Sequence, residues 1–325
     1  MITSRVSKWD EVDVHDLAEI AYLSLQASAS SRREGLTIEG MENWLRRLEF
    51  DLAPVVIQAF SADKAIGWLL LFLHDDKRGE INPWALNGHP LIIPGTQRKQ
   101  ITVKLLERAI SFGKQQGLSR IELAFQRSSG DYGKSIDKNK NLYESLGFKF
   151  VTETAIMRMS LSSLDFRDNQ IPSQYTISPL IETDYDELYK CYFETFRTGQ
   201  DRFFFDQNDD EKLAYFESIF DKSEPLNREA SLVLLENNQI IGFSLVRPTH
   251  GEGNVHLWMF GIHPGYRRRG LGKATLRYII WKSKEQGFRT MSLGCEPTNQ
   301  PAYKLYISHG FREEFRKMEF TWKSK

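Results

Sequence analysis

The chain has 325 residues, of which 41% are hydrophobic and 26% charged, values that are ordinary for a globular protein and a length that suggests two domains. Its 43 basic and 43 acidic side chains cancel, so the composition gives no support to a nucleic-acid or membrane-surface role. The two cysteines, Cys191 and Cys295, are too few and too far apart for a disulfide framework or a zinc site, and we expect no metal.

The beginning of the chain predicts a cytoplasmic protein. Residues 1–16 contain neither an apolar core nor a small-residue cleavage pattern. The apolar run Ile66–Leu73 is too short to span a bilayer.

The first half predicts a helix, then strands, then a helix. Apolar residues recur at helical spacing over Asp16–Ala27. Val55–Phe60 predicts a strand, and Ile66-Gly67 is expected to form the turn beside it in an antiparallel pair. A second helix is expected over Thr102–Gln115, ended by Gly117.

A polar, proline-containing segment after Ser160 predicts the domain boundary. We expect domains over residues 1–160 and 175–325, joined by a linker over 161–174. The second half then repeats the order of the first. Helices are expected over Asp184–Thr195 and Lys273–Lys284, the latter ended by Gly287, with a strand over Leu232–Leu235 and a turn at Ile241-Gly242 between them.

Three segments of the first half recur in the second in the same order, which predicts a tandem repeat. Gly117–Leu123 and Gly287–Leu293 begin 170 residues apart, and Leu142–Phe148 and Leu305–Phe311 begin 163 apart. The glycines of Ile66-Gly67 and Ile241-Gly242 are 175 apart.

The segment Val255–Ala274 predicts a strand, a basic glycine turn and the start of a helix. Glycines at Gly270 and Gly272 let an anion approach backbone N–H groups, and the helix dipole and three arginines add positive potential there. Strand alternation places His256 and Trp258 on one face with Phe260 and Ile262. The turn alone is a weak signal.

A second motif follows about 25 residues downstream, with Asn299, Ala302, Leu305-Tyr306 and Gly310-Phe311. In this order and spacing, the two motifs closely resemble the acetyl-CoA-binding core of the GNAT superfamily of N-acetyltransferases. The resemblance covers about the last half of the chain. It implies an α/β fold of two tandem GNAT domains, similar in arrangement to mycothiol synthase. Each would be a mixed, mostly antiparallel sheet flanked by helices and splayed between its fourth and fifth strands.

The resemblance also implies the roles of site residues in the second half. The pantetheine arm of acetyl-CoA would pair with the fourth strand, one of whose N–H groups would face the developing oxyanion. Tyr306 would be the general acid and also contact the cofactor, and Asn299 would bind pantetheine. His256 is one candidate for the general base, and Glu252 is its main rival. The expected cofactor-binding residues are Phe260, Gly261, Ile262, Arg267, Arg268, Arg269, Gly270, Leu271, Gly272, Lys273, Ala274, Asn299 and Tyr306.

The first half lacks the parts on which this resemblance depends. Gln100 and Thr102 stand where the loop glycines would be, and Ile136 and Asn139 replace the Asn and Ala of the second motif. Tyr143 is kept, and we interpret it as a core residue. We therefore expect a degenerate first domain that binds little or no acetyl-CoA.

The segment Phe193–Phe220 interleaves aromatic and acidic residues, which suits an amine-bearing acceptor but equally a helix that covers the sheet. We expect an acetyl-CoA-dependent transferase that acetylates a primary amine, on a small molecule or a peptide, by direct attack in a ternary complex. A non-catalytic CoA-binding sensor and an aminoacyl-transferring relative are the alternatives. A monomer and a homodimer are both compatible with the sequence, and no nucleic-acid or membrane partner is expected.

Overall fold

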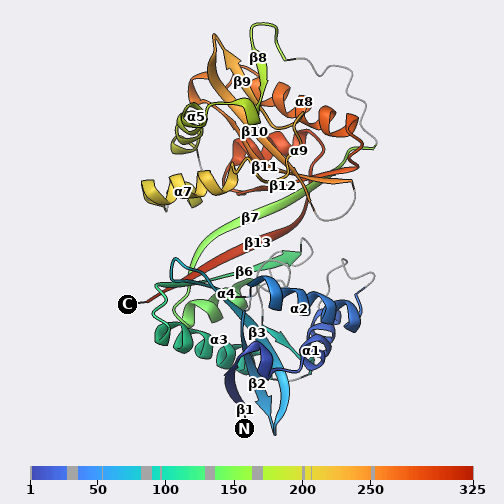
Figure 1. The fold of residues 1–325 in the computed structure, drawn as a ribbon, viewed down its shortest axis with the longest axis vertical. Helices are drawn as coiled ribbons and strands as arrows, with labels where there is room; N and C mark the ends of the chain where they lie inside the picture. The colour runs from blue at the N-terminus through green and yellow to red at the C-terminus, as the bar shows by residue number, and fades with distance from the viewer. Residues whose placement is uncertain are drawn as a thin grey trace. The chain divides into compact units, whose positions relative to one another are not determined.

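The computed structural model describes residues 2–27, 36–52, 54–81, 90–95, 97–128, 136–162, 171–199, 202–205, 207–249 and 253–324. The chain divides into two compact units, which are Met1–Val151 with Lys317–Lys325 (unit 1) and Thr152–Arg316 (unit 2). Each unit is a mixed sheet with helices against it, as expected (Figure 1).

Unit 1 begins with a strand and two helices. Its elements are β1 (Ile2–Ser7), α1 (Val14–Gln26), α2 (Ile38–Leu52), β2 (Val55–Ser61), β3 (Lys64–Leu73), β4 (Arg78–Ile81), β5 (Leu91–Ile92), α3 (Arg98–Gln115), β6 (Arg120–Ser128) and α4 (Ile136–Ser145). The sheet order is β1-β2-β3-β4-β6, with β5 paired to β3. The β4–β6 pair is parallel, and the β1–β2, β2–β3 and β3–β4 pairs are antiparallel.

Unit 2 repeats this plan. Its elements are β8 (Thr176–Pro179), α5 (Tyr185–Arg197), α6 (Arg202–Phe205), α7 (Asp209–Ile219), β9 (Leu232–Glu236), β10 (Gln239–Pro248), β11 (Asn254–Ile262), α8 (Leu271–Glu285), β12 (Thr290–Cys295) and α9 (Gln300–Ser308). The sheet order is β12-β11-β10-β9-β8. The β11–β12 pair is parallel and the β10–β11, β9–β10 and β8–β9 pairs are antiparallel.

Two long strands, β7 (Lys149–Ser160) and β13 (Arg312–Lys323), give a domain division that differs from the predicted one. Residues of β7 after Val151 belong to unit 2, and those from Ala155 to Ser160 pair with β12. Residues of β13 after Arg316 belong to unit 1, where Phe320 is part of the core. The predicted division at 160–175 followed the composition of the polar segment, whereas the units are defined by long-range strand pairing.

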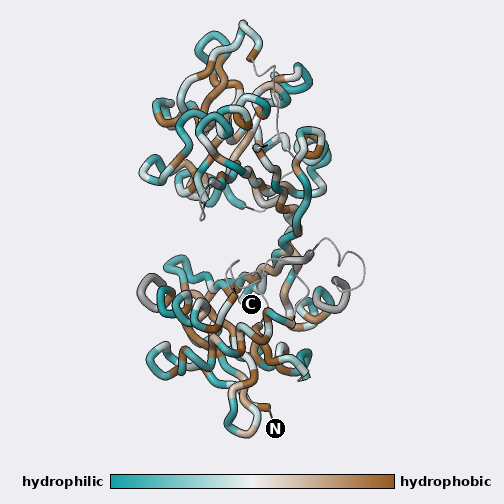
Figure 2. Tube along the Cα trace, turned by 90° about the vertical axis from the view of Figure 1, so that its right-hand side faces the viewer, coloured by the Kyte–Doolittle hydropathy of each residue, from teal (hydrophilic) through white to brown (hydrophobic). Residues whose placement is uncertain are grey.

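Helices cover both faces of the sheet of unit 1, which explains the unbroken apolar run in β3. Leu69 and Leu71 pack in the cluster that contains residues of α3, and Trp68 and Leu70 pack in the cluster that contains residues of α1. Alternate side chains therefore enter two different cores. Figure 2 shows hydrophobic stretches of the trace within each unit.

The predicted turns at Ile66-Gly67 and Ile241-Gly242 are wrong, because both glycines lie inside strands. The turns are Ala62-Asp63 and Asn237-Asn238, four residues with positive φ. A Cβ on Gly67 or Gly242 would lie 3.0 Å from a carbonyl oxygen of the neighbouring strand. Both glycines thus allow close strand approach beside a register shift in the hairpin. The shared irregularity supports the repeat.

Candidate active site

The two central strands of unit 2 diverge along their length. Strand β11 pairs with β12 from Asn254 to Leu257, opposite Thr290 to Leu293. Beyond Leu257, β11 continues beside β10 as far as Ile262, while β12 continues beside β7 as far as Cys295. The backbone of β11 from residue 258 onward therefore has no pairing to β12 among the described residues. An extended ligand can add to such a strand edge through main-chain hydrogen bonds.

A bulge in β11 changes which side chains share a face. Leu245 of β10 is opposite Met259, but its neighbour Val246 is opposite Leu257, so Trp258 is an extra residue. Leu257 and Phe260 consequently both pack in the cluster beside α8, and Met259 packs in the cluster beside α5. The prediction that His256 and Trp258 share a face with Phe260 and Ile262 is therefore wrong, because uniform alternation does not hold across a bulge.

The predicted phosphate loop leads into the N-terminus of α8. Gly270 precedes the helix with a φ of 79°, and the first turn closes with the Ala274 N–H donating to the Gly270 carbonyl. The N–H groups of residues 271–273 thus precede the intrahelical bonds. A Cβ built on Gly270 would meet nothing within 4 Å, and one on Gly272 would meet its nearest atom at 3.7 Å. An open, N–H-rich helix start of this kind fits a pyrophosphate.

The three arginines of this loop have different environments. Arg267 is partly buried, and its guanidinium donates to the carbonyl oxygens of Ile262, Thr195 and Thr198. Arg269 is exposed, donates to the Gly265 carbonyl at 3.0 Å and lies over the Tyr266 ring. Arg268 is exposed in a left-handed conformation. The sequence does not distinguish these environments.

Tyr306 lies in α9 with only 7% of its surface exposed and packs its ring against Phe311. Burial raises the pKa of its phenol, and nearby Cys295 adds to this effect. The phenol is therefore protonated at neutral pH. Asn299 is the N-cap of α9, and its side-chain oxygen accepts from the Ala302 N–H at 3.4 Å. The second motif thus shapes the start of this helix.

His256 lies on the face of β11 opposite Val255 and Leu257. Its Nδ1 is 2.8 Å from the Ser292 hydroxyl on β12. Burial lowers the pKa of the imidazole to about 4, with a further contribution from Arg158. Arg158 lies on β7, directly opposite Ser292, and forms an ion pair with Glu314 at 3.0 Å. Neither Ser292 nor Arg158 can be assigned to His256 from the sequence, since no motif connects β12 or β7 with β11.

Glu252, the rival base, lies outside the described residues. The aromatic segment Phe193–Phe220 contributes mainly to the core, since Phe204, Phe216 and Phe220 are buried in the cluster that contains Phe243. Two of its acidic residues form local ion pairs, Glu194 with Arg197 at 2.6 Å and Asp209 with Lys212 at 3.0 Å. These contacts favour the interpretation as a sheet-covering layer. Asp201 and Asp206 also lie outside the described residues.

Two short strands of unit 1, β4 and β5, make the pairings that β11 makes in unit 2. Gly67 is opposite Ile92 of β5 as Gly242 is opposite Ile262, whereas β4 supplies the pairing to β6. Strand β4 ends at Ile81, and β5 begins at Leu91. Tyr143 is fully buried among aromatic rings, as expected for a core residue.

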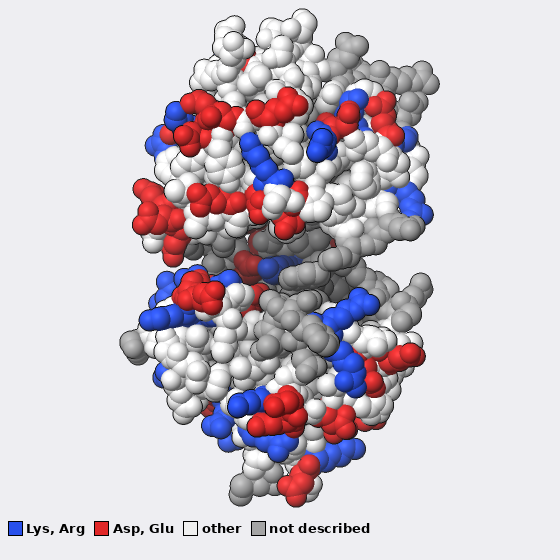
Figure 3. All heavy atoms as spheres, in the orientation of Figure 1, with Lys and Arg blue, Asp and Glu red and all other residues white. Residues whose placement is uncertain are grey.

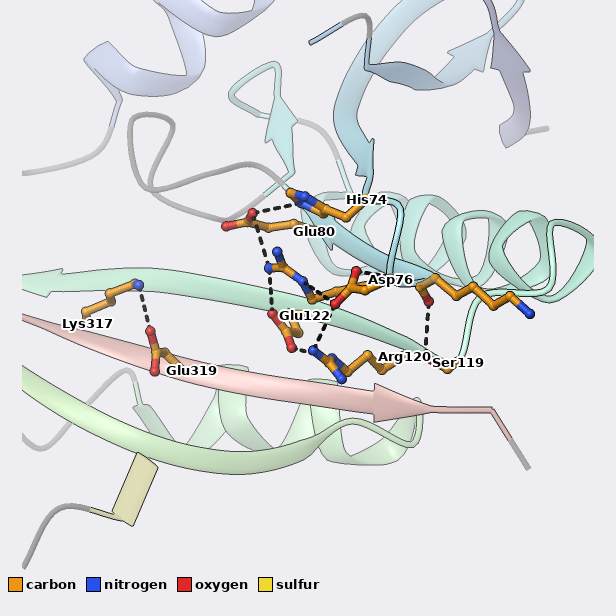
Figure 4. Close-up of polar contacts among 10 residues, drawn as sticks. His74, Asp76, Glu80, Ser119, Arg120, Glu122, Lys317 and Glu319 are labelled. Atoms are coloured by element: carbon orange, nitrogen blue, oxygen red, sulfur yellow. Dashed lines mark hydrogen bonds and ion pairs between the residues drawn. The ribbon is translucent and has the colours of Figure 1, made fainter. Parts of the chain in front are cut away.

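Unit 1 carries an ion-pair network where unit 2 has His256 and Ser292. Glu80 is opposite Glu122 in the parallel pair, the register that His256 and Ser292 have in unit 2. Arg78 contacts Glu122 at 3.1 Å, and His74 contacts Glu80 at 3.3 Å (Figure 4). In unit 1 the two side chains at this position, Glu80 and Glu122, are thus both held in ion pairs.

On the face shown in Figure 3, acidic and basic side chains occur on both units, in line with the zero net charge. Among the described helices, none has the length and apolar character needed to cross a bilayer. The same part of the chain contains no group of three or more His, Cys, Asp or Glu side chains arranged to bind a metal ion.

Comparisons with known proteins match the second half of the chain to one family. The profile of the Acetyltransferase (GNAT) family matches residues 182–311. The ribosomal protein bS18-alanine N-acetyltransferase of Haemophilus influenzae is 36% identical over 92 residues, 28% of this chain and 61% of that protein. The mycothiol acetyltransferase of Streptomyces avermitilis is 25% identical over 175 residues, 53% of this chain and 54% of that protein. The chain thus spans little more than half the length of these relatives.

Solved structures show the same fold over nearly the whole chain. A GCN5-related N-acetyltransferase from Sphaerobacter thermophilus superposes with a TM-score of 0.66 at 15% identity, covering 99% of this chain and 95% of that one. A tandem GNAT protein from the clavulanic acid biosynthesis pathway superposes with a TM-score of 0.58 at 14% identity, covering 99% and 98%. Residues 182–311 thus match the GNAT acetyltransferase family, and the chain has the fold of tandem GNAT proteins.

Proposed function

We propose that unit 2 is an N-acetyltransferase that uses acetyl-CoA, and that unit 1 has no catalytic role. The observation that carries this proposal is the divergence of β11 from β12. The end of β11 that lacks pairing to β12 leads into the open start of α8. The free edge of β11 suits the amide-bearing pantetheine arm, and the N–H groups of residues 271–273 suit the pyrophosphate. Among the described residues of unit 1, two short strands, β4 and β5, stand in place of β11, and Gln100 and Thr102 stand in place of the two loop glycines.

The proposed reaction is direct attack of a primary amine on the thioester carbonyl. The C–N bond forms, the C–S bond breaks, one amine proton passes to a base and the sulfur accepts one proton. A backbone N–H of β11 near Phe260 or Gly261 would stabilise the charge that develops on the carbonyl oxygen. Tyr306 would donate a hydrogen bond and then a proton to the departing sulfur. A phenol is already a weaker acid than an alkyl thiol, and burial raises the pKa of Tyr306 further, so stabilisation of the thiolate by the hydrogen bond comes before proton transfer.

The proposal is tested by measuring thiol release from acetyl-CoA with a panel of amines. The panel should contain peptides that begin with alanine, because one named relative is a protein-alanine N-acetyltransferase, and small amino sugars and aminothiols, because another is a mycothiol acetyltransferase. Amine-dependent release supports a transferase. Binding of acetyl-CoA without turnover would instead support a sensor, and absence of binding would favour an aminoacyl-transferring relative.

We expect one acetyl-CoA to bind per chain. Side chains at Gln100 and Thr102 replace the loop glycines in unit 1, although a hollow of about 550 Å³ lined by Gln97, Arg98, Lys99, Gln100 and Val103 lies at the start of α3. Isothermal titration calorimetry should give a stoichiometry near one. Two sites of equal affinity would contradict the degenerate first domain.

If His256 is the base, the acidic limb of kcat/KM should lie near pH 4 instead of near pH 6.5. The pKa of His256 is lowered to about 4, and a base acts unprotonated, so its contribution rises with pH through 4 and is constant above about pH 5. We expect His256→Gln to lower the plateau and to remove this limb.

The amine substrate also titrates, but its titration affects the parent protein and His256→Gln equally. The ratio of their kcat/KM values between pH 4 and 8 therefore reports the titration of His256 alone. A ratio that does not change with pH, together with an unchanged plateau, would move the base to Glu252 or to water held by strand carbonyls.

A further inference from the structure

Arg267 joins two elements that lie far apart in the sequence. Its Nε donates to the Ile262 carbonyl at 3.0 Å, at the end of β11. Its Nη2 donates to the Thr195 carbonyl at 2.7 Å and its Nη1 to the Thr198 carbonyl at 3.3 Å, at the end of α5. One guanidinium therefore bonds to the last turn of α5 and to the last residue of β11.

These bonds suit an arginine in particular. The last carbonyls of a helix have no intrahelical donor, and a cation is favourable at this end of the helix dipole. The planar guanidinium reaches three carbonyls at once, which the single ammonium of lysine does not reproduce. A group that makes three such bonds has few donors left for a phosphate.

The last turn of α5 also packs against β11 through a contact between Thr195 and Gly261. A Cβ built on Gly261 would lie 2.6 Å from Cγ2 of Thr195 and 2.8 Å from the Phe243 ring, so the absence of a side chain at Gly261 lets α5 approach the strand. Thr195 is thus held through its methyl group by Gly261 and through its carbonyl by Arg267. Both contacts are on the face of β11 opposite α8, which is also the face of His256.

We propose that Arg267 is a positioning residue for the acceptor side of the site, and not a phosphate ligand of the adjoining loop. It holds the last turn of α5 against β11. The kinetic consequence rests on the proposed transferase function, in which the amine approaches from the face that α5 and His256 share. The structural consequence, a fixed end of α5, does not depend on that function.

The test compares Arg267→Gln and Arg267→Lys with Arg269→Gln, a change in the same loop at a side chain that bonds only within it. Both Arg267 variants should raise the KM for the amine about tenfold, the effect of losing a charge-assisted hydrogen bond. Their dissociation constants for acetyl-CoA should stay within about twofold of the parent value. Arg269→Gln should instead raise the dissociation constant for acetyl-CoA and leave the KM for the amine nearly unchanged. Full rescue by lysine, or a loss of acetyl-CoA affinity equal to that of Arg269→Gln, would overturn the proposal.

Hydrogen exchange gives a readout that needs no acceptor. In both Arg267 variants the amides at the end of α5 should exchange faster, while those of α8 keep their protection. Unchanged exchange in α5 would also overturn the proposal. If no amine is acetylated, the proposed function fails while the exchange and titration results still decide the role of Arg267. Should Arg267→Gln fail to fold, Arg267→Lys carries the test.

Discussion

Replacing Tyr306 by phenylalanine should lower kcat about 100-fold while leaving acetyl-CoA affinity nearly unchanged. The change removes only a hydroxyl, so the packing of the ring against Phe311 is kept. Burial keeps the phenol protonated, and its hydrogen bond to the departing sulfur exists mainly as the C–S bond breaks. Steady-state turnover with acetyl-CoA and the best amine of the panel, together with calorimetry, measures both quantities.

Tyr303→Phe is the matched control for this prediction. Tyr303 lies in the same helix, but its hydroxyl donates to Glu313 at 2.8 Å. Its loss should cost some stability and leave kcat within about twofold of the parent value. Full turnover in Tyr306→Phe would show that solvent protonates the thiolate, and equal losses in the two variants would indicate a general effect on α9.

Replacing Gly270 by glutamate should weaken acetyl-CoA binding by about 3 kcal/mol, on the order of a hundredfold. The substitution places a carboxylate beside the proposed pyrophosphate site and strains a residue whose φ is 79°. The position is exposed and a Cβ there meets no neighbour within 4 Å, so the fold should survive. Calorimetric titration of the folded variant measures the loss of affinity.

Gly287→Glu separates the charge at the binding site from the backbone strain. Gly287 follows the other end of α8, has a φ of 84°, is exposed and also has no neighbour within 4 Å of a built Cβ. The two variants therefore share the strain and the added charge, but only Gly270→Glu should lose acetyl-CoA affinity. Similar affinities in both variants would exclude this loop from the cofactor site.

Much of the fold could be predicted from local signals. Apolar periodicity predicts α1, α5 and α8 at the places where they occur. Gly117 and Gly287 follow the ends of α3 and α8, and both have the positive φ expected of a glycine after a helix. The repeat was visible because three local segments recur in order. Ile66-Gly67 was misread as a turn because glycine serves both turns and close strand contacts, and only the pairing partner distinguishes them.

The repeat, the family resemblance, the glycine loop before α8 and the candidate acid Tyr306 can all be recognised from the sequence, because each depends on residues close together in the chain. The residues that surround them are known only from the fold. The bulge at Trp258 places His256 on the face of β11 opposite Phe260. Arg158 on β7 lowers the pKa of His256. The Arg267 guanidinium donates to α5 and not within its own loop. The ends of β7 and β13 likewise fell in different units from the rest of their strands. These outcomes depend on strand pairing and side-chain contacts between distant segments, for which neither periodicity nor motif spacing carries information.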